Sequence, residues 1–284
     1  MSLISIVGAG TLGGTLAHTL ASRGRIAEVR LIDEAGAVAA GHALDIQQAG
    51  PIEGFRTRVS ADSDIAAVIG SSVVMFTGPA GEGKGDWEEE KGLKLVERVV
   101  QLERRAVLIC AGASQRRLIE RAVGELKIAR RRLVGSAPAA LASAIRMMVA
   151  LELHCSPGEV HIPIAGVPPE LTVVVWSEGV AQGVTLTRAL EPARLVRLRQ
   201  LVPRLWPPGP YALASAASRI AEAAAAGGST RASPCFLVLD GEWGARGLAA
   251  CAPVVLGPHG VERIIELSPS AYERVQIETA VQGR

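Results

Sequence analysis

The sequence LISIVGAGTLGGTLAHTLASRGRIAEVRLID, residues 3–33, contains the pattern that decides the fold. An apolar run at Leu3–Val7 is followed by a glycine-rich turn and by a helix-period segment at Leu12–Ser22, and a second apolar run follows at Val29–Ile32. A strand, a turn, a helix and a strand in this order are typical of a βαβ unit, whose two strands are parallel. The stretch therefore predicts the first unit of a doubly wound parallel sheet.

The turn itself, GAGTLG at residues 8–13, has the glycine spacing of a dinucleotide-binding loop. Gly8, Gly10 and Gly13 permit a tight turn and let the backbone approach a pyrophosphate, whose charge then faces the N-terminus of the helix. Asp33 stands twenty residues after Gly13, where a carboxylate can accept hydrogen bonds from the adenosine ribose and repel a 2′-phosphate. The stretch predicts a site for NAD in preference to NADP. A packing turn and a solvated aspartate are the alternatives, and basic residues nearby leave tolerance of NADP open.

The rest of the chain indicates two domains. Strands expected at Val73–Thr77 and Val107–Cys110 continue the alternation, and a long Ala-rich helix at Ala139–Leu153 then changes the pattern. We expect an N-terminal Rossmann domain over residues 1–138 and a C-terminal α+β domain over residues 139–284. The other expected elements are strands Val160–Ile164, Leu171–Trp176, Cys235–Leu239 and Ala252–Leu256, and helices Thr187–Leu205, Tyr211–Ala226 and one from Ser268.

The composition is that of an ordinary folded protein. A chain of 284 residues with 49% hydrophobic residues can bury a large core, and its net charge of +2 combines 30 basic and 28 acidic residues spread along the sequence. We therefore expect no nucleic-acid partner and no membrane partner. Apolar structure begins directly after Met1, which leaves no room for a signal peptide and predicts a cytoplasmic protein. The four widely spaced cysteines favour buried thiols, and no metal site is predicted.

Short segments along the whole chain match one known family in order and spacing. They are GAGTLGG (8–14), LID (31–33), ALDI (43–46), VVMFTG (73–78), LVGS (133–136), VWS (175–177), GEWG (241–244), PVVLG (253–257) and GVERII (260–265). On these segments the chain resembles the lactate/malate dehydrogenase family from end to end. The resemblance implies a nucleotide domain followed by a family-type C-terminal domain. With it, the expected NAD contacts are Gly8, Gly10, Thr11, Leu12, Gly13, Asp33, Thr77 and Gly78.

The resemblance also indicates what this chain lacks. Family enzymes reduce a keto acid with a proton donor for its carbonyl and cations for its carboxylate. By alignment, the family's histidine falls on Pro168, the aspartate that orients it on Leu141, and the carboxylate-binding arginine on Ala144. Arg146 is a poor replacement, because two residues along a helix turn a side chain by roughly 200°. We therefore predict no catalytic residue of the family's type.

The loop that follows the fourth strand has changed the sign of its charge. The family's two loop arginines fall on Glu82 and Glu88, and a family asparagine falls on Gly112 in a chain that contains no asparagine. If the protein catalyses a different reaction, Glu82, Glu88, Glu170 and Lys84 are the candidate acid/base groups. An acidic loop then predicts a neutral or cationic substrate.

The histidines do not suggest a replacement acid/base. They are His18, His42, His154, His161 and His259. Among them His161 is the least implausible, because it precedes Gly166 on the same expected strand, although a strand histidine facing a helix or solvent is the simpler interpretation.

Three functions remain open at this point. The first is a pseudoenzyme that binds NAD(H) as a sensor, regulator or assembly partner and does not interconvert pyruvate and lactate or oxaloacetate and malate. The second is an active NAD-dependent oxidoreductase of altered substrate class, and the third is a structural protein with a vestigial nucleotide site. We also expect a homo-oligomer, a dimer or tetramer, because the helix containing residues 43–46 resembles one that family members use to pair subunits, an ordinary helix-to-sheet contact being the alternative.

Overall fold

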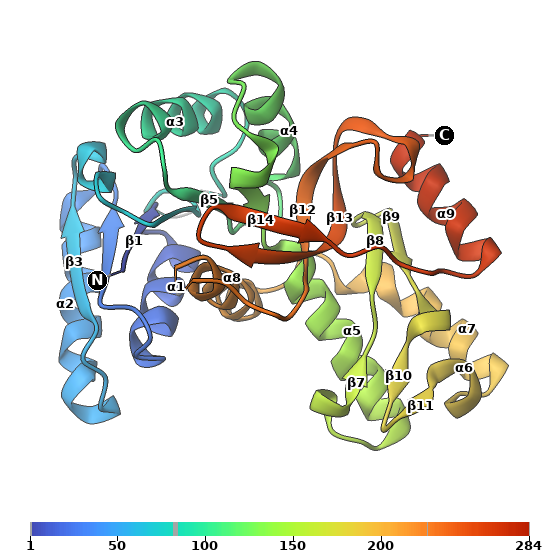
Figure 1. The fold of residues 1–284 in the computed structure, drawn as a ribbon. Coiled ribbons are helices and arrows are strands. Elements are labelled where there is room, and N and C mark those ends of the chain that lie inside the picture. Colours follow the sequence, from blue (N-terminus) through green and yellow to red (C-terminus); the bar gives the residue numbers. More distant parts are fainter. Residues whose placement is uncertain (1, 82–84, 226, 284) are drawn as a thin grey trace.

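In a computed structural model, the chain is described for residues 2–81, 85–225 and 227–283. Its first part alternates strands and helices, as the sequence predicts (Figure 1). The strands are β1 (Leu3–Val7), β2 (Glu28–Ile32), β3 (Arg58–Asp62), β4 (Val73–Phe76), β5 (Val107–Cys110) and β6 (Leu133–Gly135), and the helices are α1 (Thr11–Ser22), α2 (Gly36–Glu53), α3 (Glu89–Leu102) and α4 (Arg116–Glu125). These strands pair in parallel in the order β3-β2-β1-β4-β5-β6, so their carboxyl ends meet along one edge.

The second part extends the same sheet with antiparallel strands. Its helices are α5 (Ala137–Leu153), α6 (Leu186–Ala189), α7 (Pro192–Leu201), α8 (Pro210–Ala225) and α9 (Ala271–Gln282). Its strands are β7 (Val160–His161), β8 (Ile164–Val167), β9 (Leu171–Val174), β10 (Val180–Ala181), β11 (Val184–Thr185), β12 (Ser233–Asp240), β13 (Arg246–Gly257) and β14 (Gly260–Ile264). β12 pairs with β6, and the order continues β12-β13-β8-β9 with β14 on β13, while β11-β10-β7 form a separate small sheet. The predicted doubly wound α/β fold is confirmed.

Two predicted elements are wrong as single elements, and proline explains both. The predicted strand Val160–Ile164 is interrupted, because Pro163 has no N–H to donate to a neighbouring strand. The predicted helix Thr187–Leu205 divides into α6 and α7 because Pro192 cannot continue a helix and instead begins the second one. In the predicted helix Tyr211–Ala226, the last residue lies outside the described part of the chain.

The core consists of one apolar layer on each face of the sheet. Strand residues Val74 and Phe76 belong to an apolar cluster that contains residues of α3 and α4, whereas their neighbours Val73 and Met75 belong to a cluster that contains residues of α1, α2 and α8. This alternation follows from the period of two in a strand and explains why β4 and β5 are apolar at every position. Among the described residues, no helix has the length and apolar character that crossing a membrane requires.

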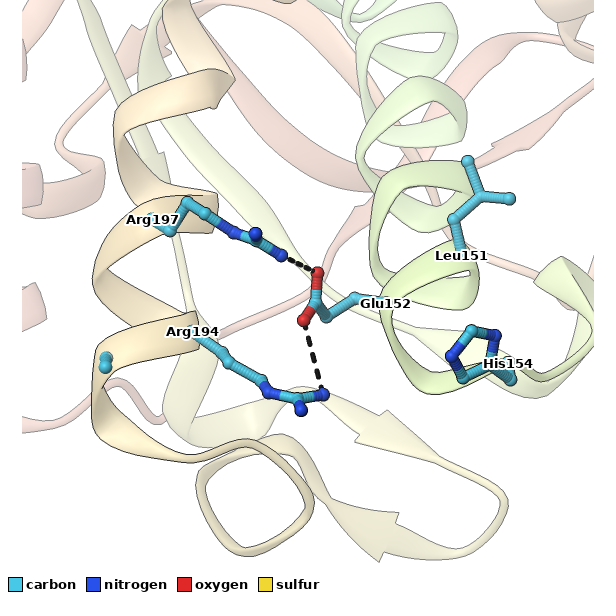
Figure 2. A pocket seen from close by; sticks show the side chains of 6 residues that line it. Leu151, Glu152, His154, Arg194 and Arg197 are labelled. Atoms are coloured by element: carbon cyan, nitrogen blue, oxygen red, sulfur yellow. Dashed lines mark hydrogen bonds and ion pairs between the residues drawn. The ribbon is translucent and has the colours of Figure 1, made fainter.

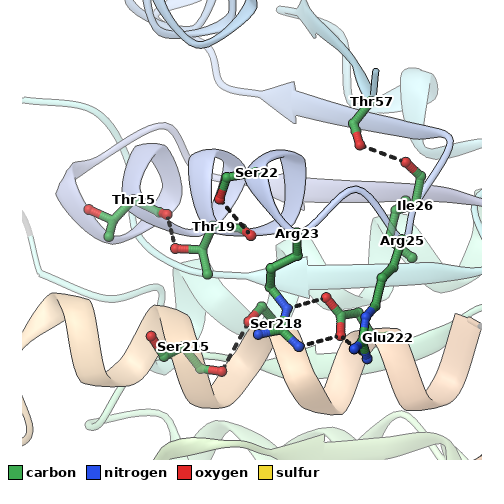
Figure 3. A network of polar contacts seen from close by, with 10 residues as sticks. All are labelled: Thr15, Thr19, Ser22, Arg23, Arg25, Ile26, Thr57, Ser215, Ser218 and Glu222. Carbon is green, nitrogen blue, oxygen red and sulfur yellow. Dashed lines mark hydrogen bonds and ion pairs between the residues drawn. The ribbon is translucent and has the colours of Figure 1, made fainter. Parts of the chain in front are cut away.

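Ion pairs join helices that are distant in the sequence. Glu152 of α5 contacts Arg194 and Arg197 of α7 beside a surface cavity of about 470 Å³ (Figure 2). Glu222 of α8 contacts Arg23 and Arg25, which follow α1 (Figure 3). The ion pairs of Glu222 are more enclosed than those of Glu152, because Glu222 is only 4% exposed. It therefore ties the first helix of the parallel half to a helix of the second half.

The hydrogen bonds to Glu222 raise the pKa of Arg23, and Glu222 accepts from the Nη2 atom of Arg23 at 2.8 Å. We expect Glu222→Ala to lower the free energy of unfolding by about 2–3 kcal/mol, because it leaves a partly buried guanidinium without a partner. Chemical denaturation measures this change. The control is Glu125→Ala, which breaks an exposed pair with Arg121 on α4. An effect of Glu222→Ala no larger than that of the control would contradict the assignment.

Candidate functional site

The eight residues predicted to contact NAD lie where β1, β2 and β4 end. Gly8 follows β1 with a φ of 112°, and Gly10 is the N-cap of α1 with no side-chain hydrogen bond and no acidic residue in the first turn. A Cβ atom on Gly13 would lie 2.0 Å from the carbonyl oxygen of Gly8, so only glycine fits there. Thr77 holds the turn from below, since its hydroxyl donates to the Gly8 carbonyl at 2.9 Å. The uncapped helix end leaves the N-terminal dipole available to an anion.

The structure shows a second role for Asp33, which the sequence predicts to face a ribose. Asp33 is only 6% exposed and accepts hydrogen bonds from the backbone. Its Oδ2 accepts from the N–H groups of Ala9 at 2.7 Å and Ala80 at 2.8 Å, and its Oδ1 accepts from Ala35 at 2.9 Å. Asp33 therefore fastens the glycine turn and the segment after β4 to the end of β2.

The segment after β4 lies directly against the glycine turn. The Gly10 N–H donates to the Gly78 carbonyl at 3.1 Å. A Cβ atom on Gly8 would be 2.4 Å from the Gly78 oxygen, and one on Gly10 would be 2.8 Å from the Pro79 oxygen. The residues of the glycine turn thus suit a dinucleotide in their chemistry. The backbone of Gly78 and Pro79 occupies part of the space beside that turn. A ribose would have to replace the Ala80 N–H on Asp33.

The structure adds a cluster that the sequence analysis missed. Trp87 donates from its backbone N–H to the Thr77 carbonyl at 2.9 Å and from its indole to the Val7 carbonyl at 3.1 Å. Gln115 is fully buried, accepts from the Gly112 N–H at 2.8 Å and donates to the carbonyls of Thr77 and Trp87. These bonds pin the residues before α3 to the ends of β1, β4 and β5.

Asp86 belongs to the same cluster and lies beside Gly112, the position on which the sequence analysis places the family's asparagine. A Cβ atom on Gly112 would lie 2.1 Å from the Asp86 carboxyl carbon, so the carboxylate fills the space that the glycine leaves. Asp86 accepts from the backbone N–H of Ser114 at 3.1 Å and from its hydroxyl at 2.8 Å. The sequence offers one signal for this contact. Gly112 has no side chain, so it leaves space that a side chain from another segment can occupy.

Two of the positions on which the sequence analysis places the family's substrate groups, Pro168 and Leu141, are apolar and buried. Pro168 is buried at the end of β8, and Leu141 is 1% exposed in α5. Arg146 is half-buried farther along α5, where burial lowers the pKa of its guanidinium and the charges of Arg219 and Arg231 lower it further. Arg146 therefore belongs to a cationic group shared with α8 and the chain before β12.

The other predicted acid/base residues are not brought together. Glu82 and Lys84 lie outside the described residues, whereas Glu88 is the exposed N-cap of α3 and Glu170 is exposed beside a cavity of about 170 Å³ near α9. Within the described ranges no group of three or more histidine, cysteine or acidic side chains could hold a metal ion.

The histidines lie in separate places, and the prediction that His161 shares a strand with Gly166 is wrong. His161 is exposed on β7, in the small sheet, whereas Gly166 is on β8. His18 contacts Glu53, His42 packs beside Gly14, His154 ends α5 and His259 lies in the turn before β14.

Residues 2–101 match the family model described as lactate/malate dehydrogenase, NAD binding domain. A malate dehydrogenase of Desulforudis audaxviator (strain MP104C) is 29% identical over 99% of this chain and 95% of its own length. A malate dehydrogenase of Roseiflexus sp. (strain RS-1) is 26% identical over the same shares.

Solved structures show the same fold at lower identity. A malate dehydrogenase from Salinibacter ruber superposes with a TM-score of 0.86 at 24% identity, covering 99% of this chain and 94% of that one. A minor L-lactate dehydrogenase from Enterococcus mundtii superposes with a TM-score of 0.87 at 21% identity, covering 99% of this chain and 96% of that one. The fold therefore extends over nearly the whole of both chains.

The hydrogen bonds of Asp33 predict a double effect of removing it. We expect Asp33→Ala to lower the free energy of unfolding by about 2–4 kcal/mol without nucleotide, because three backbone N–H groups lose a charged acceptor. It should also narrow any preference for NAD over NADP, because the repulsion of a 2′-phosphate is lost. Denaturation and calorimetric titration measure the two effects. The exposed neighbour provides the control Glu34→Ala, and equal effects of the two variants would refute this role.

Proposed function

We infer that this chain belongs to the lactate/malate dehydrogenase family and is an NAD(H)-binding protein without that family's keto-acid chemistry. The match of residues 2–101 to the NAD binding domain and the full-length similarity to malate dehydrogenases support the family and the cofactor. The loss of activity is our proposal. One observation carries it, namely that Pro168 and Leu141 are both buried and apolar at the positions of the catalytic histidine and its aspartate.

The cofactor half of the site is complete in residue type. The backbone N–H groups at the start of α1 would hold the pyrophosphate, and Asp33 would accept the adenosine ribose once Ala80 has given way. NAD, when bound, supplies a hydride acceptor or donor. The segment Gly85–Trp87 would cover the other end of the cofactor site and exclude water from it.

An active enzyme of different substrate class is the second candidate. It is favoured by the nearly complete coverage of relatives named malate dehydrogenase and by Asp86, a carboxylate held at the position of the family's asparagine. A carboxylate there repels keto-acid anions and suits a neutral or cationic carbonyl compound. The two candidates share the cofactor site and differ only in turnover.

We expect no turnover of pyruvate or oxaloacetate with NADH. A missing general acid typically costs about 10² to 10⁴-fold, and Asp86 and Glu88 add repulsion of the anionic substrate. The measurement is NADH oxidation by protein that has been shown separately to bind NADH, with a family enzyme assayed in parallel. Turnover on the order of 10 per second would refute the proposal. Turnover confined to neutral or cationic carbonyl compounds would establish the second candidate instead.

We also propose a homo-oligomer that pairs through α2. On this helix Ala43 and Ile46 are buried against the parallel part of the sheet. Leu44, in contrast, is 61% exposed, and Ile52 is more exposed still. An exposed apolar helix face is stabilised when a second copy covers it. Analytical ultracentrifugation should give a dimer or tetramer of the 29.6 kDa chain, and Leu44→Glu should shift it toward the monomer. A monomer at all concentrations tested would rule the proposal out.

A further inference from the structure

Asp86 is held more firmly than an ordinary loop residue. Gly85 passes over Gly78 so closely that a Cβ atom on Gly78 would be 2.3 Å from the Gly85 oxygen. On the other side, the backbone N–H of Trp87 is bonded to Thr77. Ser114 donates twice to one Asp86 oxygen, Oδ2. The carboxylate is therefore fixed at the carboxyl ends of β4 and β5.

The negative charge of Asp86 acts on groups beneath it. Burial raises the pKa of the Cys110 thiol at the end of β5, and the charge of Asp86 raises it further. Ser136 follows the neighbouring strand β6, and its N–H donates to the Cys110 carbonyl at 3.0 Å. Its hydroxyl is the one buried side-chain oxygen or nitrogen of the described residues that has no hydrogen-bond partner. The ends of β5 and β6 thus combine a fixed anion with an unsatisfied hydroxyl.

A dinucleotide bound in a doubly wound fold lies across the point where the strand order reverses, which is between β1 and β4 here. The adenosine half belongs on the β2 side, where Asp33 ends the strand, so the nicotinamide half belongs over the ends of β4, β5 and β6. The oxidised nicotinamide ring carries a positive charge and the reduced ring carries none. A fixed carboxylate distinguishes the two by Coulomb attraction.

We propose that Asp86 biases this site toward NAD⁺ over NADH. The inference rests on the proposed NAD(H) binding and adds a preference for one redox state of the cofactor. It gives Asp86 a role that needs no substrate. It also makes occupancy of the protein depend on the ratio of oxidised to reduced nucleotide, which is the property that a redox sensor requires.

The experiment is calorimetric titration of the full chain with NAD⁺ and with NADH at neutral pH. Asp86→Asn preserves shape and removes the charge. We expect it to weaken NAD⁺ binding about tenfold and to leave NADH within about twofold, as for a charge pair that is partly exposed to water. Ser114→Ala, which loosens the carboxylate, should shift the ratio in the same direction by less. The matched control is Glu97→Gln, which removes one charge from an exposed position of α3.

The outcomes separate the inference from the function on which it rests. If the wild type binds both nucleotides and Asp86→Asn changes both equally or neither, the redox preference is overturned and NAD(H) binding stands. If the wild type binds neither nucleotide at millimolar concentration, the proposed function fails and the inference fails with it. If circular dichroism shows that Asp86→Asn does not fold, Ser114→Ala provides the test. An unchanged ratio of its affinities for NAD⁺ and NADH would then overturn the redox preference.

Discussion

The candidate site depends on how closely two backbone segments approach each other at Gly8 and Gly78. Parallel pairing of β1 with β4 brings their carboxyl ends side by side, and only residues without a Cβ atom allow the turns beyond them to touch. This contact allows the Gly10 N–H to donate to Gly78 and the Ala80 N–H to donate to Asp33. It also lets Gly85 and Asp86 pass over Gly78, close to the carboxyl ends of the strands. Any side chain at Gly8 would move all of these together.

The two halves of the candidate site differ in the chemistry of the residues that line them. On the β2 side the glycines, the uncapped helix and Asp33 remain in place. On the β5 side, the Asp86 carboxylate is held by two hydrogen bonds from Ser114. A fixed anion at this position attracts a cationic ring and repels a carboxylate substrate.

Local pattern was sufficient to predict most of the fold, including the strand, turn and helix that carry the glycine loop. β1 and β5 have the bounds that their apolar runs predict, and the glycine turn lies between a strand and a helix as expected. The contacts that join distant residues could not be predicted in this way. Ala80 and Asp33 are 47 residues apart, and Ser114 and Asp86 are 28 apart, so no periodicity relates them. Their pairing depends on the course of a loop, which a single sequence does not encode locally.

The bond from the Trp87 indole to the Val7 carbonyl places an aromatic ring at the end of β1, beside the glycine turn. Emission from an indole depends on the polarity and hydrogen bonding around it, and the absorption of reduced nicotinamide overlaps that emission. Of the four tryptophans of the chain, Trp87 is the one whose indole donates to the strand end that precedes the glycine turn. Loss of this hydrogen bond would change the polarity around the Trp87 indole, so the intrinsic fluorescence of the chain is expected to respond to movement of the segment after β4.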